Sequence, residues 1–152
     1  MNKSIACITA GVILGILLIN PLYVEAAKPQ TTIELSYEDA QLLMRIGQAE
    51  AGNQGVTGMW LVMCVILNRV DSPEWPDTIS EVIYQPCHQF TTPADIEDVT
   101  VEAHLALARL EMGYRISDIV AFERKESNIL DSYFDLSFID QDHKFYKEKA
   151  KP

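Results

Sequence analysis

The sequence predicts an α+β fold in one domain that is mainly helical and ends in a small antiparallel sheet. Apolar residues recur at helical spacing up to Gly113, and short alternating runs follow only after it. The length of 152 residues allows one ordinary domain. With 48% hydrophobic and 22% charged residues, the composition excludes an intrinsically disordered chain.

The first segment, 1–27, has the pattern of a secretory signal peptide. Lys3 provides a positive start, and the uncharged run from Ile5 to Ile19 precedes small residues suited to cleavage. Asn20-Pro21 interrupts this run before the roughly 20 apolar residues that a membrane-spanning helix needs. We therefore expect a secreted or cell-wall-associated protein, attached to a membrane only if this segment is retained.

The folded domain is expected over 36–152, after an extended leader at 28–35. Ser36 is a good N-cap for a helix that ends near Ala51. A second helix is predicted from about 57 to 70, where nine consecutive apolar residues indicate burial on all sides.

The remaining elements are shorter. A short helix is expected over 78–84, a loop over 85–93 and a third long helix over 100–111. Three short strands are predicted at 119–123, 133–138 and 143–146.

Charge excludes some functions. The chain has 12 Lys and Arg against 22 Asp and Glu, a net charge of −10. Such a surface does not favour nonspecific nucleic-acid binding, which depends on neutralising phosphates, nor attraction to anionic lipids. His88, His104 and His143 form no metal-binding sequence pair, so we expect neither a metal nor another cofactor. We expect a monomer.

Glu50 is the first candidate for catalysis. It shares the apolar stripe of Leu43 and Ile46 and lies in the last helical turn, where the helix dipole disfavours negative charge by about 0.3–1 kcal/mol. Both effects favour the protonated carboxyl that general-acid chemistry requires. The alternative is a carboxylate at the edge of the stripe, in water.

Cys64 and Cys87 remain after signal-peptide removal. In an oxidising compartment they could form a disulfide, which would stabilise the fold by about 3 kcal/mol. The alternative is a buried thiol at Cys64. A free Cys87 would instead permit a cysteine peptidase with His143 as the base.

An ordered set of motifs resembles the spore cortex-lytic type of cell wall hydrolase. The set covers Ala49–Gly55, Val65–Val70, Trp75–Ile79, Val82–Pro86, Gln89-Phe90 and Asp142–Tyr146.

This resemblance implies a lysozyme-like domain that cleaves peptidoglycan glycan strands by lytic transglycosylation. Glu50 would protonate the oxygen between N-acetylmuramic acid and N-acetylglucosamine, and then accept the C6 hydroxyl proton, giving a 1,6-anhydromuramic product. Ordinary muramidase hydrolysis would need a second carboxylate. The sequence does not choose among the available Asp71, Glu74, Asp95 and Asp135.

The expected substrate-binding residues are Tyr84, Gln89, Phe90, His143 and Tyr146. For Tyr84, Gln89 and His143 the alternative is a structural role. The loop at Cys87-His88 is one residue longer than usual, Glu123-Arg124-Lys125 replaces an Asn-Pro continuation, and Gln141-Asp142 replaces Gly-Asn. These departures leave a noncatalytic peptidoglycan-binding protein as an alternative.

Overall fold

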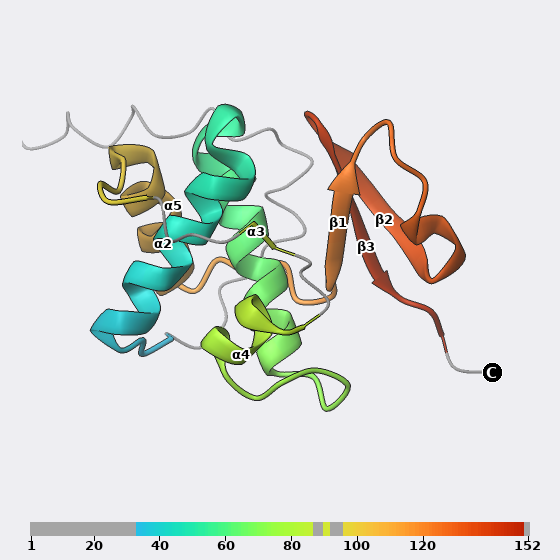
Figure 1. Cartoon of the computed structure of the whole chain (residues 1–152), viewed down its shortest axis with the longest axis horizontal. Helices are drawn as coiled ribbons and strands as arrows, with labels where there is room; N and C mark the ends of the chain where they lie inside the picture. The colour runs from blue at the N-terminus through green and yellow to red at the C-terminus, as the bar shows by residue number, and fades with distance from the viewer. Residues whose placement is uncertain (1–32, 87–89, 92–95, 151–152) are drawn as a thin grey trace, which may run out of the picture.

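Helices form the first part of the domain and an antiparallel sheet the last, as predicted (Figure 1). This computed structural model describes residues 33–86, 90–91 and 96–150. The α-helices are α2 (Tyr37–Ala51), α3 (Gly55–Val70), α4 (Ile79–Tyr84) and α5 (Val101–Glu111). The strands are β1 (Ala121–Arg124), β2 (Phe134–Asp140) and β3 (His143–Glu148), and two 3-10 turns are η1 (Gly52–Gln54) and η3 (Leu130–Ser132).

The helix starts are set by side-chain caps. The Ser36 hydroxyl accepts a hydrogen bond from the Asp39 backbone N–H at 3.1 Å, which confirms the predicted start of α2. Thr78 and Thr100 cap α4 and α5 in the same way. Each cap satisfies a backbone donor that the first helical turn leaves without a partner.

α3 is the centre of the fold. Every residue from Gly58 to Arg69 is buried, which confirms the prediction from its apolar run. α2, α4 and α5 pack around α3. Trp60 is completely buried, and its indole N–H donates to the Tyr114 carbonyl at 2.8 Å, so this large ring is satisfied inside the core.

The connection between α2 and α3 is tighter than the predicted turn. The 3-10 turn η1 leads directly into α3, which therefore begins at Gly55 rather than near 57. Gly55 has φ +63°, a conformation that costs glycine little. A Cβ at Gly58 would lie 2.5 Å from the Cβ of Gln54, so a glycine there allows η1 to pack closely on α3.

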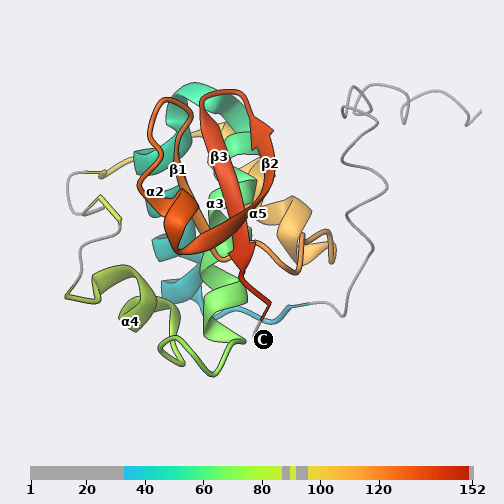
Figure 2. The ribbon, with the colours of Figure 1, turned by 90° about the vertical axis from the view of Figure 1, so that its right-hand side faces the viewer.

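The sheet has the strand order β1-β3-β2, with both pairs antiparallel. It lies beside the helices, and Figure 2 shows it in front of them. A ring cluster comprises Phe122, Phe138, His143 and Phe145. Phe145 belongs to the hydrophobic core, and Phe122 and Phe138 pack against that core, so the cluster joins the sheet to the helices.

Two distant parts of the chain meet at one end of the domain. The junction of α2 and α3 lies next to the turn between β2 and β3 (Figures 1 and 2). The Gln141 side chain, from a residue with φ +46°, donates to the Gln54 carbonyl at 3.0 Å. This contact brings the predicted catalytic region of α2 to the start of β3.

The predicted signal peptide lies outside the described residues. Of the predicted leader, Ile33 and Leu35 are described and pack against the hydrophobic core. No helix in the described part of the chain has the length and apolar character needed to cross a membrane.

Candidate active site

Glu50 occupies the last turn of α2 and is half-buried. Leu43 and Ile46 of the same stripe are completely buried, so Glu50 lies where that stripe reaches the surface. Its carboxylate accepts a hydrogen bond from the Thr91 backbone N–H. Half-burial and a fixed hydrogen bond hold the carboxyl group in a defined position while one side stays open to solvent.

His143, the first residue of β3, is paired with a glutamine from η1. The Gln54 amide nitrogen lies 2.7 Å from His143 Nδ1, although the two residues are 89 positions apart in the sequence. Each residue is only 6% exposed. The hydrogen bond is therefore shielded from water and fixes the orientation of the imidazole.

The surroundings of His143 favour its neutral form. Its ring meets Phe122 edge-on at 5.2 Å. Burial lowers the pKa of His143, and Glu50, followed by Asp142, is the carboxylate that most opposes this shift. The imidazole therefore favours its neutral form more than a solvent-exposed histidine does, and Glu50 is the charge that acts on it most strongly.

Polar residues surround this pair. The Asn53 amide lies 3.5 Å from the Asp142 carboxylate, across the contact between η1 and the β2–β3 turn. Both side chains are exposed, so they provide hydrogen-bonding groups at the rim. Such groups suit a hydroxyl- and amide-rich ligand.

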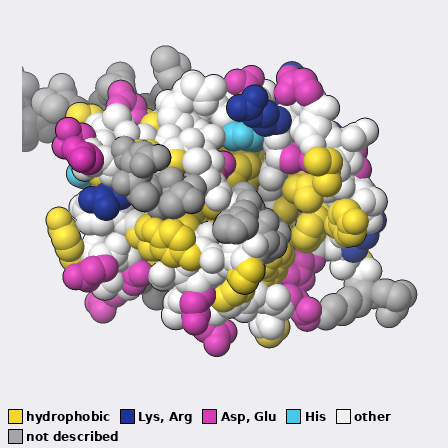
Figure 3. Space-filling view, viewed as in Figure 1, with side chains coloured by type: hydrophobic (Ala, Val, Ile, Leu, Met, Phe, Trp, Pro, Cys, Tyr) yellow, Lys and Arg dark blue, Asp and Glu magenta, His cyan; other side chains and the backbone are white. Residues whose placement is uncertain are grey.

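A pocket of about 410 Å³ lies along β1, and neither Glu50 nor His143 is among the residues that line it. Phe90, Phe122 and Arg69 are among its lining residues. The Arg69 guanidinium packs between the rings of Trp75 (4.1 Å) and Phe90 (5.1 Å), while Arg69 Nε donates to the Val120 carbonyl at 2.6 Å. In Figure 3, a histidine lies in the upper part of the view beside a Lys or Arg side chain, with hydrophobic side chains below it.

The predicted binding residues do not all meet at Glu50. His143 is coupled to Glu50, and Phe90 directly precedes Thr91, which bonds Glu50. Phe90 is buried, so its ring offers little exposed surface to a substrate. Tyr84 is 53% exposed and lines a different depression, beside α4, to which Glu50 and His143 do not contribute. Gln89 lies outside the described residues.

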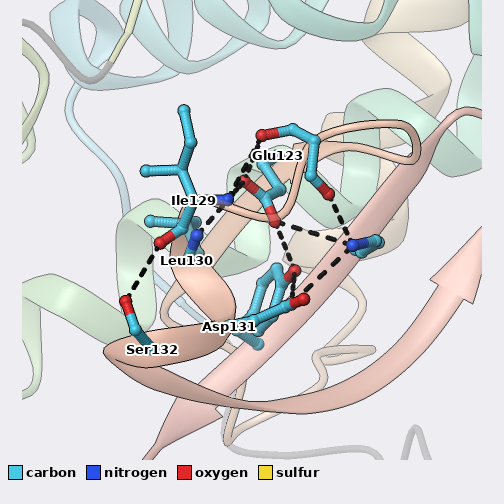
Figure 4. Close-up of polar contacts among 8 residues, drawn as sticks. Glu123, Ile129, Leu130, Asp131 and Ser132 are labelled. Atoms are coloured by element: carbon cyan, nitrogen blue, oxygen red, sulfur yellow. Dashed lines mark hydrogen bonds and ion pairs between the residues drawn. The ribbon is translucent and has the colours of Figure 1, made fainter.

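Tyr146 requires a correction, because it is completely buried. Its hydroxyl lies 2.5 Å from Glu123 and 2.7 Å from Asp131, in the network with Lys144 that holds the segment around η3 (Figure 4). Burial, followed by these two carboxylates, raises the pKa of Tyr146. We therefore assign Tyr146 to the structure of the sheet and not to substrate binding.

Cys64 is a free thiol and is completely buried in α3. Burial raises its pKa to about 12, so the thiol stays protonated and unreactive. This finding argues against the disulfide considered above and favours the alternative of a buried thiol. Cys87, the proposed partner and the nucleophile of the peptidase alternative, lies outside the described residues.

The sequence offered four candidates for a second carboxylate. Asp71 and Glu74 follow the far end of α3, about 24 Å along that helix from η1. Asp71 is also paired with Arg115 at 2.8 Å. Asp135 is on β2, opposite Lys147, and Asp95 lies outside the described residues.

Three residues near Glu50 were missed. These are Gln54, Thr91 and Asp142. Unusual residues at Gln141-Asp142 mark the turn in the sequence, but only the fold shows that this turn contacts η1, which follows the helix that carries Glu50. Among the described residues, no group of three or more His, Cys, Asp or Glu side chains could hold a metal ion.

The chain matches a protein-family model. The model for a family described as Cell Wall Hydrolase matches residues 53–133. The match covers more than half of the chain, starting just after Glu50 and ending before His143.

Curated relatives and solved structures agree with this match. Proteins named spore cortex-lytic enzyme, from Halalkalibacterium halodurans and Oceanobacillus iheyensis, are each 42% identical over 60 residues. This segment is 40% of the present chain but only 18% and 21% of those proteins, so the chain matches about a fifth of their length.

The fold resembles two crystallised catalytic domains. One is that of the germination-specific lytic transglycosylase SleB from Bacillus anthracis, with a TM-score of 0.65 over 74% of this chain and 97% of that one. The other is that of Bacillus cereus SleB, with a TM-score of 0.60 over 78% and 98%. Sequence identity is 24% in both cases, so this likeness establishes the fold, mainly helical with a small antiparallel sheet.

Proposed function

Since the chain belongs to the cell wall hydrolase family, we propose that it cleaves peptidoglycan glycan strands by lytic transglycosylation, with Glu50 as both acid and base. One observation carries the proposal. The Glu50 carboxyl is half-buried, held by the Thr91 N–H and coupled to a buried neutral imidazole, next to a surface rich in hydrogen-bonding groups.

The proposed reaction needs one carboxyl group. Protonated Glu50 gives its proton to the glycosidic oxygen as the bond from C1 of N-acetylmuramic acid breaks. The resulting carboxylate then takes the proton of the C6 hydroxyl, whose oxygen bonds to C1 and closes the 1,6-anhydro ring. No water is consumed, and Glu50 regains its proton.

Hydrolysis is the alternative that the sequence left open. It would require a carboxylate that activates water or attacks C1. Among the described residues, Asp142 is the carboxylate that, after Glu50, acts most strongly on His143, and its side chain is exposed. An Asp142→Asn variant therefore separates the two reactions, because lytic cleavage does not use this group.

The experiment compares the chain lacking residues 1–27 with its Glu50→Gln variant on purified peptidoglycan. Soluble products are identified by mass spectrometry. We expect anhydro-muropeptides from the parent and a loss of at least about 100-fold in the variant. Glu102→Gln, an exposed glutamate on α5, is the matched control and should leave the rate unchanged.

Each other outcome points elsewhere. Reducing-end muramic products that disappear in Asp142→Asn would replace lytic cleavage by hydrolysis. Binding to insoluble peptidoglycan without any release would support the noncatalytic alternative. Free stem peptides would support the Cys87 peptidase, and full activity in Glu50→Gln would remove Glu50 from the mechanism.

We also propose that the protein acts outside the cytoplasm, as a monomer without a cofactor, after removal of residues 1–27. Analysis of the secreted chain should then find an N-terminus near Lys28. A retained segment would instead leave the protein in the membrane fraction.

A further inference from the structure

The Gln54 side chain contacts His143 through its amide nitrogen, which lies 2.7 Å from Nδ1. Its buried amide oxygen has no hydrogen-bond partner among the residues that the structure describes. Within the described part of the chain, the hydrogen-bonding contact of the Gln54 side chain is therefore the one it makes with His143. Gln54 lies four residues after Glu50, directly beside the proposed catalytic centre.

This contact determines which ring nitrogen of His143 carries a proton. With the amide N–H donating, Nδ1 is an acceptor, and the single proton of a neutral imidazole must be on Nε2. A reversed amide would place the proton on Nδ1 instead and leave the amide nitrogen buried without a partner. The two arrangements therefore make opposite predictions for the ring.

We propose that Gln54 is a positioning residue that holds His143 as the neutral Nε2–H tautomer beside Glu50. This inference rests on the role of Glu50 proposed above. It adds a second residue to the machinery, one that acts through His143 and does not itself react.

The chemistry explains why an amide suits this position. An imidazolium next to Glu50 would favour the ionised carboxylate and so deprive the first step of its proton. A neutral imidazole adds no positive charge, yet its N–H can stabilise the carboxylate that forms when the glycosidic bond breaks. A carboxylate in place of the Gln54 amide would favour the charged imidazole.

The charged groups around His143 do not determine which ring nitrogen carries the proton. Besides Glu50, the groups that act on it are Asp142 and Asp140, which favour the imidazolium, and Arg124, which opposes it. Gln54 is the residue that contacts Nδ1 directly. The Gln141 side chain also donates a hydrogen bond to the Gln54 backbone carbonyl. Gln54 is therefore held through both its backbone and its side chain.

The first test uses the unaltered protein. Long-range proton–nitrogen NMR spectra distinguish the two tautomers and the imidazolium, and a His104→Gln variant helps to assign the His143 signals. We expect His143 to be neutral at pH 7, with its proton on Nε2. A proton on Nδ1, or an imidazolium at pH 7, would overturn the proposal.

The second test changes Gln54. In Gln54→Glu the pKa of His143 should rise by at least about one unit, and kcat at pH 7 should fall about tenfold or more with little change in KM. The activity of Gln54→Glu relative to the wild type should rise toward alkaline pH, as the imidazole of the variant loses its proton. Gln54→Leu should lose the tautomer preference in the spectrum.

Gln48→Leu provides the matched control. Gln48 is also on α2, and its amide bonds the Asp98 carbonyl and the Thr100 N–H, so its loss should lower stability without moving the pKa of His143. If Gln54→Glu and Gln48→Leu give the same His143 titration and pH profile, Gln54 is merely structural. Full activity of Glu50→Gln would refute the proposed function while leaving the spectroscopic result standing.

Discussion

Arg115 donates a hydrogen bond from Nε to the Asn68 amide oxygen at 2.7 Å, and both side chains are buried. The Asn68 amide nitrogen bonds the carbonyls of Ile116 and Ile119, at 2.8 and 2.6 Å. Through these bonds the end of α3 holds the segment that leads into β1. Asn68 thus supports the fold, at the end of α3 remote from Glu50.

Asn68→Ala should therefore lower the free energy of unfolding by about 3 kcal/mol, because Arg115 Nε and the carbonyls of Ile116 and Ile119 lose their buried partner. Denaturant unfolding followed by circular dichroism measures this change. Asp71→Ala removes the other Arg115 partner, which is 68% exposed, and should cost less than about 1 kcal/mol. Equal losses in the two variants would contradict this assignment.

Glu123 should make the protein sensitive to acid. Burial alone would raise the pKa of Glu123, but hydrogen bonds from Ser127, Tyr146 and Leu130 outweigh it and lower the pKa below 4.5. A carboxylate with a lowered pKa in the folded state stabilises it above the unfolded value, and this stability is lost as pH falls through the folded value.

The measurement is the free energy of unfolding between pH 7 and pH 3, in the wild type and in Glu123→Gln. We expect the variant to be less stable by about 1–3 kcal/mol at pH 7, with a shallower decline below pH 4.5. If the free energy of unfolding falls equally with pH in the wild type and in Glu123→Gln, Glu123 is not the cause of the loss of stability in acid.

Gly58→Ala tests the close packing of η1 on α3. Replacing glycine by alanine inside a helix normally stabilises it by about 0.5–1 kcal/mol. Here the new Cβ would lie 2.5 Å from the Gln54 Cβ, so we expect destabilisation and a shift of the His143 NMR signals. Gly52→Ala is the control, since its Cβ meets nothing closer than 3.9 Å. If Gly58→Ala is as stable as Gly52→Ala, η1 can shift to accommodate the added Cβ without loss of stability.

Cys64 should be inert while the protein is folded. In a chain without residues 1–27 and with Cys87→Ser, a thiol reagent at pH 8 should fail to modify Cys64 until denaturant is added, because its pKa is raised to about 12. The corresponding chain with Cys87 intact should titrate two thiols after denaturation. Finding none would establish the disulfide.

Local sequence patterns predicted the elements well. The apolar run of α3 can only be buried, and Ser36 and Thr78 are recognisable caps, so these features need no tertiary information. The predicted strands at 119–123, 133–138 and 143–146 agree with β1, β2 and β3 within two residues at each end.

The site was predicted only in part. Helix periodicity places Glu50 on the apolar stripe, and its expected catalytic role comes from the family resemblance. The pairing of Gln54 with His143 joins residues 89 positions apart and has no local signal. Tyr146 was misassigned because its motif says nothing about which face of the sheet it takes. The carboxylates of Glu123 and Asp131, which hold it, come from parts of the chain that periodicity treats separately.

The meeting of η1 with the β2–β3 turn has a consequence for biogenesis. Glu50 enters the fold early along the chain, whereas His143 arrives with the last strand. A chain cut before β3 would keep Glu50 and Gln54 but would lack the imidazole that Gln54 contacts. The surroundings of Glu50 are therefore complete only after the last strand of the sheet has paired.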